Sequence, residues 1–265
     1  MNLGLKGKVA IITGASGGIG SGCARVFAEE GCNVVLNYFS RPDRAEALAA
    51  ELERTYGIKA LPVQADVGNA DDIKKMFKET IDAFGTVDIL INNAGAVGDK
   101  FRAHVPIENF DLDNFRRREA IIVESLFVSA KEMTAILREQ KKGGHIVNVL
   151  SKSAYWSSTA GNTMYATTKG AAGVFTQALA HELAYENIYV NAIIPGYVTN
   201  PRTDTATEHY RANLDRTPMR RYATPEEMGA ICAFLCSDQA QTINGARIDC
   251  TGGAMNGDVE PMKRA

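Results

Sequence analysis

Short apolar runs rich in β-branched residues alternate with amphipathic stretches along the whole chain. This alternation is typical of strands joined by crossover helices, which together build a parallel sheet. Several of the runs are apolar throughout, as strands are when helices cover both faces of their sheet. The sequence therefore predicts an α/β fold with a single doubly wound parallel sheet flanked by helices on both faces.

The individual elements can be placed by their hydrophobic periodicity and by the glycines and prolines that end them. The predicted strands are Val9–Thr13, Asn33–Asn37, Ala60–Gln64, Ile89–Asn92, His145–Leu150, Tyr189–Ile193 and Arg247–Cys250. The predicted helices are Gly18–Glu30, Arg44–Tyr56, Ala70–Phe84, Leu112–Glu139, Thr163–Glu186 and Pro225–Cys236. Two long stretches, Ala94–Asp111 and Tyr197–Arg221, are predicted to be irregular, and long loops of this kind often carry function.

Length and charge restrict the class of protein. A chain of 265 residues, 45% of them hydrophobic, can form one core, so we expect one domain over residues 1–256 and a polar tail over residues 257–265. The net charge of −2 gives no reason to expect nucleic acid or an anionic membrane as a partner. No apolar run approaches the ~20 residues of a membrane span, and the first residues leave no room for a signal peptide. We expect a cytoplasmic protein that acts on a small molecule.

The cysteines and histidines do not have the spacing of metal ligands. Five cysteines and four histidines are present, without a C-x-x-C or H-E-x-x-H pattern. Cys232 and Cys236 lie four residues apart on a predicted helix, which favours packing over redox chemistry. We expect no metal site and thiols in a reducing compartment.

A glycine-rich turn, Gly14-Ala-Ser-Gly-Gly-Ile-Gly20, joins the first predicted strand to the first predicted helix. Glycines let the backbone approach a pyrophosphate closely, and the start of a helix offers unpaired N–H donors with a favourable dipole. The turn is therefore interpreted as a binding site for a nucleotide phosphate. A purely structural turn is the alternative, because glycines also serve close packing of a helix on a strand.

Tyr165 and Lys169 are four residues apart on a predicted helix, so their side chains share one face. A neighbouring ammonium stabilises the phenolate and is expected to lower the pKa of the phenol from its usual value of about 10. Ser151 comes at the end of the strand before this helix, where its hydroxyl could hold a substrate oxygen, and Ser153 is the alternative if the strand ends later. A serine hydrolase is not indicated, since neither serine lies in a G-x-S-x-G elbow.

Four motifs occur in a fixed order: T-G-A-S-G-G-I-G from Thr13, Asn92-Asn-Ala-Gly95, Tyr165-Ala-Thr-Thr-Lys169 and Pro195-Gly196. In this order and spacing they resemble the short-chain dehydrogenase/reductase family over nearly the whole chain. The resemblance implies a Rossmann-type fold and an NAD(P)-dependent oxidoreductase that interconverts a ketone and a secondary alcohol. It also implies a homodimer or homotetramer that pairs through the two longest predicted helices.

The resemblance assigns roles to residues at matching positions. Ser151 would polarise the substrate oxygen, Tyr165 would exchange the proton, and Lys169 would bind the nicotinamide ribose. The residues that would bind the cofactor are Gly14, Ser16, Gly17, Gly18, Ile19, Gly20, Tyr38, Ser40, Arg41, Asp66, Val67, Asn93, Ala94, Gly95, Tyr165, Lys169, Pro195, Gly196, Val198 and Thr199. Asp66 and Val67 would border the adenine, and Thr199 would contact the carboxamide.

The end of the second predicted strand bears on the choice of cofactor. NAD-binding folds place an acid there to bind the adenosine ribose hydroxyls, but this stretch reads Asn37-Tyr-Phe-Ser-Arg41. Tyr38 takes the discriminating position, and Ser40 and Arg41 could donate to a 2′-phosphate, so NADP(H) is favoured. NAD(H) stays open, because Gly17 stands where many NADP-dependent relatives carry Lys or Arg, and because Arg41 could simply be solvated.

One residue departs from the family pattern. The family has an asparagine in the long helix before the serine strand, and Ile122 takes its place here, although isoleucine has no side-chain hydrogen bond to offer. Either a backbone carbonyl alone holds the water that links the lysine to solvent, or catalysis is lost and the chain is a nucleotide-binding module without turnover. The joint presence of Ser151, Tyr165 and Lys169 favours a working enzyme.

The substrate is expected to contact residues Gly95–Asp111, Ser153–Asn162 and Tyr197–Arg221. A 3-oxoacyl thioester reductase is one candidate by similarity. Relatives that use a carrier protein tend to have a basic residue late in the catalytic helix, whereas this chain has Glu186. A free small-molecule carbonyl or alcohol, such as a sugar or polyol, is therefore favoured.

Overall fold

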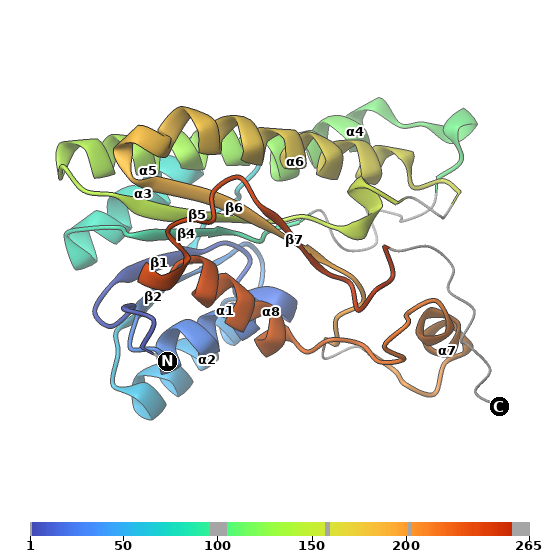
Figure 1. Ribbon diagram of the computed structural model, residues 1–265, viewed down its shortest axis with the longest axis horizontal. Helices are drawn as coiled ribbons and strands as arrows, with labels where there is room; N and C mark the ends of the chain where they lie inside the picture. The colour runs from blue at the N-terminus through green and yellow to red at the C-terminus, as the bar shows by residue number, and fades with distance from the viewer. Residues whose placement is uncertain (1, 96–104, 157–159, 201–202, 256–265) are drawn as a thin grey trace.

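The computed structural model describes residues 2–95, 105–156, 160–200 and 203–255. At its centre lies a seven-stranded sheet in the order β3-β2-β1-β4-β5-β6-β7, with every neighbouring pair parallel (Figure 1). Its strands are β1 (Val9–Ile12), β2 (Asn33–Tyr38), β3 (Ala60–Gln64), β4 (Ile89–Asn92), β5 (Gly144–Val149), β6 (Ile188–Pro195) and β7 (Arg247–Cys250). The predicted doubly wound parallel sheet is confirmed. The predicted tail over residues 257–265 lies outside the described residues.

Eight α-helices are described: α1 (Gly18–Glu29), α2 (Pro42–Tyr56), α3 (Ala70–Phe84), α4 (Leu112–Glu119), α5 (Ser125–Glu139), α6 (Thr163–Leu183), α7 (Glu208–Asp215) and α8 (Pro225–Leu235). Shorter turns of helix are η1 (Ile107–Asn109), η3 (Lys152–Ala154), η4 (Ala184–Glu186) and η5 (Asp238–Ala240), and a π-helical segment, η2, covers Ala120–Glu124. Within the described part of the chain, none of the helices is long and apolar enough to cross a membrane.

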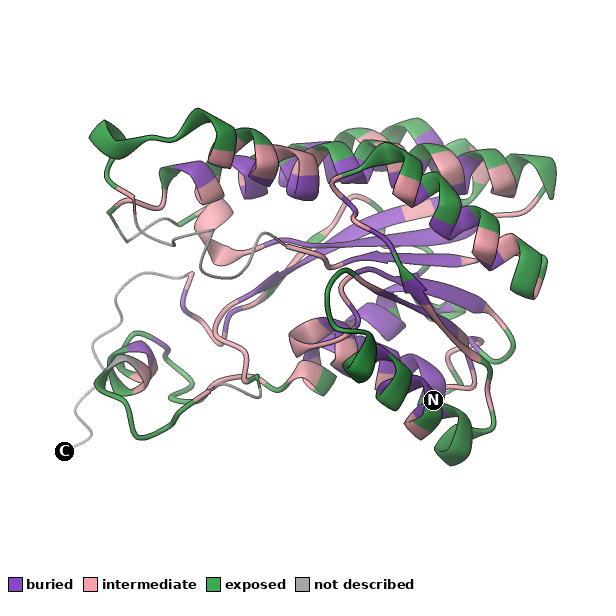
Figure 2. Cartoon of the chain, turned by 180° about the vertical axis from the view of Figure 1, so that it is seen from behind, coloured by how far each residue is buried: buried purple, intermediate pink, exposed green. Residues whose placement is uncertain are grey.

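The helices form two layers that enclose the sheet. Helices α3, α5 and α6 lie on one face, and α1, α2 and α8 lie on the other (Figure 1). Each layer has its own apolar core, one around Ile11, Leu90 and Ile146 and one around Ile12, Phe27 and Ile91. Successive residues of a strand point to opposite faces, so Ile11 and Ile12 pack in different cores. Figure 2 shows the buried strands between helices whose outer surfaces are exposed.

Apart from shifts of one to three residues at the ends of other elements, three elements differ from the prediction. The single helix expected over Leu112–Glu139 is divided, because the π-helical segment η2 separates α4 from α5. Helix α2 begins at Pro42, two residues before the predicted start, since proline is well suited to the first helical position. Helix α7 lies in a stretch that was expected to be irregular, and it begins where the Thr207 hydroxyl accepts a hydrogen bond from the Tyr210 amide at 3.1 Å.

The strand order indicates at which edge of the sheet a ligand would bind. The strand order reverses between β1 and β4, and a reversal of this kind opens a crevice at the carboxyl ends of the strands. Helix α7 and the segments around it project from the body of the molecule beyond this edge (Figure 1).

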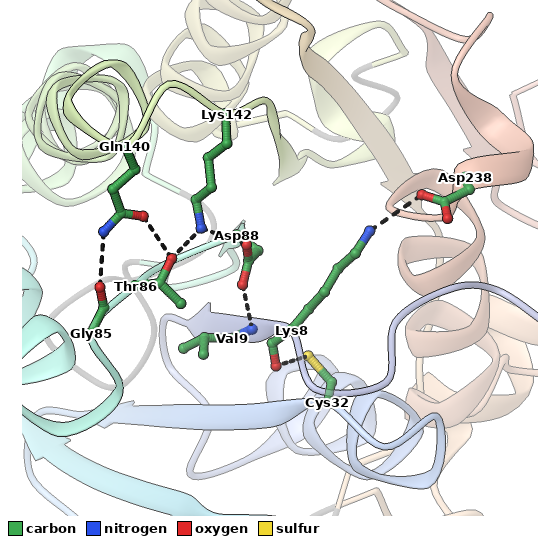
Figure 3. A network of polar contacts seen from close by, with 9 residues as sticks. All are labelled: Lys8, Val9, Cys32, Gly85, Thr86, Asp88, Gln140, Lys142 and Asp238. Atoms are coloured by element: carbon green, nitrogen blue, oxygen red, sulfur yellow. Dashed lines mark hydrogen bonds and ion pairs between the residues drawn. The ribbon is translucent and has the colours of Figure 1, made fainter.

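The opposite edge, where the strands begin, is closed by a polar network (Figure 3). Asp88 lies at its centre, because its carboxylate accepts a hydrogen bond from the Val9 amide at 2.8 Å and pairs with the Lys142 ammonium at 2.6 Å. Gln140 donates to the Gly85 carbonyl at 2.9 Å in the same network. These contacts join the starts of β1 and β4 to the end of α5, far from the carboxyl ends of the strands.

We expect Asp88→Ala to lower the free energy of unfolding by about 1–3 kcal/mol, because the Val9 amide and the Lys142 ammonium lose a partner in a largely buried setting. Urea denaturation measures this loss. Lys74→Ala is the control, since Lys74 forms an exposed pair with Asp71 within one helix, and its midpoint should match that of the wild type. An equal midpoint in Asp88→Ala would contradict a stabilising role for this network.

Candidate active site

Ser151, Tyr165 and Lys169 are brought together at the carboxyl end of β5. Ser151 follows this strand and caps the short turn η3, where its hydroxyl accepts a hydrogen bond from the Ser153 amide at 3.2 Å. Tyr165 and Lys169 come from the first two turns of α6, which passes over the end of β5. The strand thus presents the serine to the face of the helix that carries the other two residues.

The Ser151 side chain lies close enough to the Tyr165 phenol to act on its pKa. Burial raises the pKa of the Tyr165 phenol, while the Ser151 side chain and the positive charge of Arg118 act in the opposite direction. Ser153 has a different partner, because its hydroxyl accepts a hydrogen bond from the Asn162 amide group at 3.0 Å. The geometry therefore places Ser151, and not Ser153, beside the tyrosine.

Lys169 is only 5% exposed, and its ammonium donates to the Val149 carbonyl at 2.6 Å. Burial lowers the pKa of Lys169 to about 8. We expected the lysine to lower the pKa of Tyr165, but burial dominates and raises it. The Val149 carbonyl, rather than the phenol, receives the ammonium, which explains the difference.

Ile122 lies inside the π-helical segment η2 and is 3% exposed. It belongs to the apolar core beneath α5 and α6, together with Leu126 and Leu150. Segments of π-helix are frequent at functional sites, and this one contains Ile122, the residue that takes the place of the family's asparagine. Ile122 contributes apolar packing, whereas an asparagine would offer an amide.

Arg118, one helical turn before Ile122, was not predicted to take part. It is 2% exposed, and its guanidinium donates to the Asn114 side chain at 2.9 Å. Its charge acts on the pKa of Tyr165, as described above. The sequence signal that could have revealed it is spacing, because Arg118 lies four residues before Ile122, which takes the place of the family's asparagine.

Hydrogen bonds hold the glycine-rich turn against the segment that follows β4. Gly14 has a φ of +65°, and a Cβ atom at Gly20 would lie 2.4 Å from the Gly14 carbonyl oxygen. The Asn93 side chain donates to the Thr13 carbonyl at 2.8 Å, and the Thr13 hydroxyl accepts from the amides of Asn93 and Ala94 at 2.9 and 3.0 Å. Only glycine fits at Gly20 without moving the turn.

Asn37 also holds this turn and was not predicted to do so. Its side chain accepts a hydrogen bond from the Gly14 amide at 3.1 Å and donates to the Ala65 carbonyl at 3.0 Å. It therefore joins the ends of β1, β2 and β3. A buried amide in an otherwise apolar strand is the sequence signal that could have revealed it, since a buried polar group needs partners.

The outer side of the turn is open. An added Cβ at Gly17 or Gly18 would meet no described atom within 4 Å, and the described side chains do not cap the start of α1 at Gly17. The first amides of α1, which include those of Ile19 and Gly20, are thus free of a side-chain cap, and Ser16 lies directly before them. An open, uncapped helix start with glycines on its rim fits a nucleotide diphosphate.

The side of the crevice predicted for the adenosine contains two ion pairs. Arg41 is exposed and pairs with Asp43 at the start of α2, with N···O distances of 3.2 and 3.1 Å. Asp66, at the end of β3 and beside the buried Val67, pairs with Arg117 from α4 at 2.6 Å. Tyr38 is the last residue of β2, and Ser40 comes two residues later. The residues predicted to bind the adenosine therefore lie at or just after the ends of the neighbouring strands β2 and β3.

The segment after β6 carries the residues predicted for the nicotinamide end. Pro195 is the last residue of β6, and a Cβ atom at Gly196 would lie 2.9 Å from the Thr251 Cα. Val198 forms an isolated bridge with Ala223, whose carbonyl accepts hydrogen bonds from the Thr199 amide at 2.9 Å and the Thr199 hydroxyl at 3.3 Å. Gly95, by contrast, follows β4 at the limit of the described residues.

Parts of the stretches predicted to contact substrate, residues 96–104, 157–159 and 201–202, lie outside the described residues. Among the residues that are described, no three His, Cys, Asp or Glu side chains are grouped as metal ligands. The five cysteines are free, and all except Cys250 are buried.

Comparisons with known proteins agree with this geometry. A family model described as enoyl-(acyl carrier protein) reductase matches residues 14–255. The 3-oxoacyl-(acyl-carrier-protein) reductase of Staphylococcus epidermidis is 32% identical over 249 residues, 93% of this chain and 98% of the relative. A short-chain dehydrogenase from Burkholderia cenocepacia in complex with NADP has a TM-score of 0.87 and 31% identity, with 94% of this chain and 98% of that chain covered. L-Sorbose reductase from Gluconobacter frateurii, complexed with NADPH and L-sorbose, has a TM-score of 0.88 and 29% identity, with 96% and 99% covered.

Proposed function

Because the chain belongs to the short-chain dehydrogenase/reductase family, we propose that it uses NADP(H) to interconvert a small-molecule ketone and a secondary alcohol. The observation that carries the proposal is the placement of Ser151 close to Tyr165, with the buried Lys169 four residues further along the same helix. This group lies at the same sheet edge as the open glycine turn. The chain is thus a nicotinamide-dependent oxidoreductase with an acid/base group in place.

The residues of the chain handle the proton, and the nicotinamide supplies or accepts the hydride when it is bound. Ser151 donates a hydrogen bond to the substrate oxygen and holds it beside Tyr165. Tyr165 gives its hydroxyl proton to this oxygen during reduction and takes it back during oxidation. We propose that the ammonium of Lys169, like the positive charge of Arg118, favours the phenolate that reduction leaves behind.

The pH dependence of reduction should reflect Lys169, whose pKa is lowered to about 8 by burial. The ammonium is charged below this pH and neutral above it, so its support for the phenolate is lost as the pH rises. We expect kcat for ketone reduction to fall about tenfold between pH 7 and pH 9. Lys169→Met should be slow throughout and lack this fall. A wild-type profile that stays flat across pH 8 would contradict the role of Lys169.

NADP(H) is proposed over NAD(H) because the end of β2 and the start of α2 offer Ser40 and Arg41 without an acid at Tyr38. Two of the similar structures are described as complexes with NADP or NADPH. The Asp43 carboxylate now pairs with Arg41, and a 2′-phosphate would compete for the same guanidinium.

We expect Arg41→Ala to raise the Kd for NADPH about tenfold or more, because a hydrogen-bonded charge pair with the 2′-phosphate is lost. The Kd for NADH should stay close to that of the wild type. Titration of both nucleotides by fluorescence measures this, and Arg44→Ala, an exposed neighbour on α2, is the control. An equal rise in the Kd for NADPH and the Kd for NADH would show that Arg41 does not recognise the 2′-phosphate.

The preferred substrate is a free ketone or alcohol, such as a sugar or polyol, rather than a carrier-bound thioester. Glu186 follows the catalytic helix and forms an ion pair with Arg138 at 2.6 Å, so the position where carrier-using relatives tend to have a basic residue is acidic in this chain. The thioester remains the second candidate, because the Staphylococcus epidermidis relative is named for it.

A substrate panel tests the proposal. Ketoses, simple ketones and acetoacetyl-CoA are offered with NADPH and, separately, with NADH, and loss of nicotinamide absorbance is followed. We expect turnover with free ketones and with NADPH. Tight NADPH binding without turnover of any of these compounds would favour a non-catalytic nucleotide-binding module instead.

We also propose a cytoplasmic homodimer or homotetramer that pairs through α5 and α6. Phe127 on α5 is 59% exposed and Val174 on α6 is 67% exposed. The Phe127 ring lies 4.5 Å from the ring of Phe175, so the two helices share one outer apolar face. Light scattering on the purified protein measures the mass, and a monomer would contradict this proposal.

A further inference from the structure

Lys152 follows the reacting serine directly and is the first residue of η3. Its backbone is fixed, because its carbonyl accepts hydrogen bonds from the amides of Tyr155 and Trp156 at 3.0 and 2.8 Å. Its ammonium nitrogen lies 4.0 Å from the centre of the Tyr197 ring. Tyr197 belongs to the segment after β6, so Lys152 reaches from the Ser151 turn to the end of the neighbouring strand.

The Tyr197 ring is itself held in place by a column of aromatic rings. It stacks on Tyr222 with 5.2 Å between ring centres, and Tyr222 contacts Tyr210 of α7 at 4.4 Å. The Asn213 side chain donates to the Tyr222 hydroxyl at 2.9 Å. The ammonium of Lys152 therefore rests on a ring whose position α7 and its flanking segment determine.

The cation of Lys152 lacks an acidic neighbour. Over residues 2–95, 105–156, 160–200 and 203–255, no carboxylate lies within 4.0 Å of its nitrogen. Other cations near this edge differ, since Arg220 pairs with Asp215 and Arg221 pairs with Glu227. A partly buried ammonium that rests on an aromatic face retains the capacity to bind an anion.

A second cation strengthens the positive character of the site. Arg118 is buried on the α4 side, and its charge reaches Tyr165. Lys169 adds a third positive group beneath the same tyrosine. These cations favour a negatively charged ligand over a neutral one next to Ser151 and Tyr165.

On the premise of the proposed function, we propose that the substrate carries a carboxylate or phosphate group close to its carbonyl and that Lys152 binds this anion. The class of substrate is then an oxo acid or a phosphorylated ketose, with the corresponding hydroxy compounds on the alcohol side. Lys152 acts in recognition, while Ser151 and Tyr165 act on the carbonyl oxygen. The reaction itself stays the hydride and proton exchange described above.

Matched pairs of ketones test this. 3-Oxobutanoate and 4-oxopentanoate are compared with their methyl esters, and dihydroxyacetone phosphate is compared with dihydroxyacetone. The readout is the ratio of kcat/KM for the charged member to kcat/KM for the neutral member, with NADPH saturating. The two kinds of pair separate a carboxylate from a phosphate requirement.

We expect the wild-type ratio to exceed one for at least one kind of pair, and Lys152→Met to lower that ratio at least about tenfold, mainly through KM. Lys152→Arg should restore most of it. Arg247→Met is the matched control, because Arg247 also lies over a tyrosine ring, Tyr155 at 5.0 Å, but at the start of β7. Its ratio should equal that of the wild type.

A merely structural role for Lys152 gives a different result. If the lysine only holds Tyr197, Lys152→Met lowers kcat/KM for both members by the same factor, and the unchanged ratio overturns the inference. If the wild type reduces none of the compounds, the proposed function fails. The inference is then tested by calorimetry, which gives the ratio of the binding affinities of the charged and the neutral member of each pair. Equal affinity for both members in the wild type overturns it as well.

Discussion

Tyr165→Phe is expected to lower kcat for ketone reduction by about 10²–10⁴-fold, because the variant has no hydroxyl proton to give to the substrate oxygen. The Kd for NADPH should change little, since the ring is kept and only one hydroxyl is removed. The substitution is conservative for the fold, because the partly buried ring packs against the apolar core and phenylalanine fills the same space. Stopped-flow and steady-state rates with a reducible ketone measure the loss.

The control for this variant is Tyr185→Phe. Tyr185 lies in η4, after the same helix, and is 95% exposed, so its hydroxyl is far from the serine turn. Its kcat should equal that of the wild type. Full turnover in Tyr165→Phe with unaltered NADPH binding would show that another group moves the proton.

Gly20→Ala is expected to weaken NADPH binding at least about tenfold and to lower the free energy of unfolding by about 1–3 kcal/mol. The new methyl group would lie 2.4 Å from the Gly14 carbonyl oxygen and 2.6 Å from the Asn93 side-chain nitrogen. Both neighbours are part of the locked turn, so relief of the clash must move the first turn of α1 away from β4. Nucleotide titration and urea denaturation measure the two effects.

Gly17→Ala separates this steric effect from the general effect of losing a glycine. Gly17 has an extended backbone with φ of −178°, and an added Cβ would meet no described atom within 4 Å. The urea midpoint of Gly17→Ala without nucleotide should match that of the wild type. If Gly20→Ala is as stable as the wild type and binds NADPH with the same Kd, the close contact between Gly20 and Gly14 does not matter for the site.

The sheet could be predicted from the sequence because its central strands β1, β4, β5 and β6 are buried along almost their whole length and are mostly short apolar runs. The same reasoning failed in the long helical region after β4, where Ile121 and Ile122 continue the apolar pattern through the π-helical segment η2. Hydrophobic periodicity does not distinguish a π-turn from an α-turn over five residues. Helix α7 was missed because it is short and mostly exposed, so it has little apolar periodicity.

The group formed by Ser151, Tyr165 and Lys169 could be placed from local spacing, because two of its members share one helix face. Other parts of the site depend on contacts between distant segments. Arg117 pairs with Asp66 across 51 positions of sequence, and Asn37 joins Gly14 to Ala65. The raised pKa of Tyr165 likewise depends on its burial in the folded chain, which the spacing to Lys169 alone does not reveal.

The most direct test combines a label on the hydride from NADPH with removal of the hydroxyl proton of Tyr165. A reducible ketone is incubated with the enzyme and NADPH that carries deuterium at the transferred position of the nicotinamide ring, and the alcohol is examined by NMR and mass spectrometry. We expect one deuterium on the carbinol carbon, formed in equal amount to the NADPH consumed, and a sharp loss of this product in Tyr165→Phe. NADPH consumed without labelled alcohol, or labelled alcohol formed at the full rate by Tyr165→Phe, would contradict it.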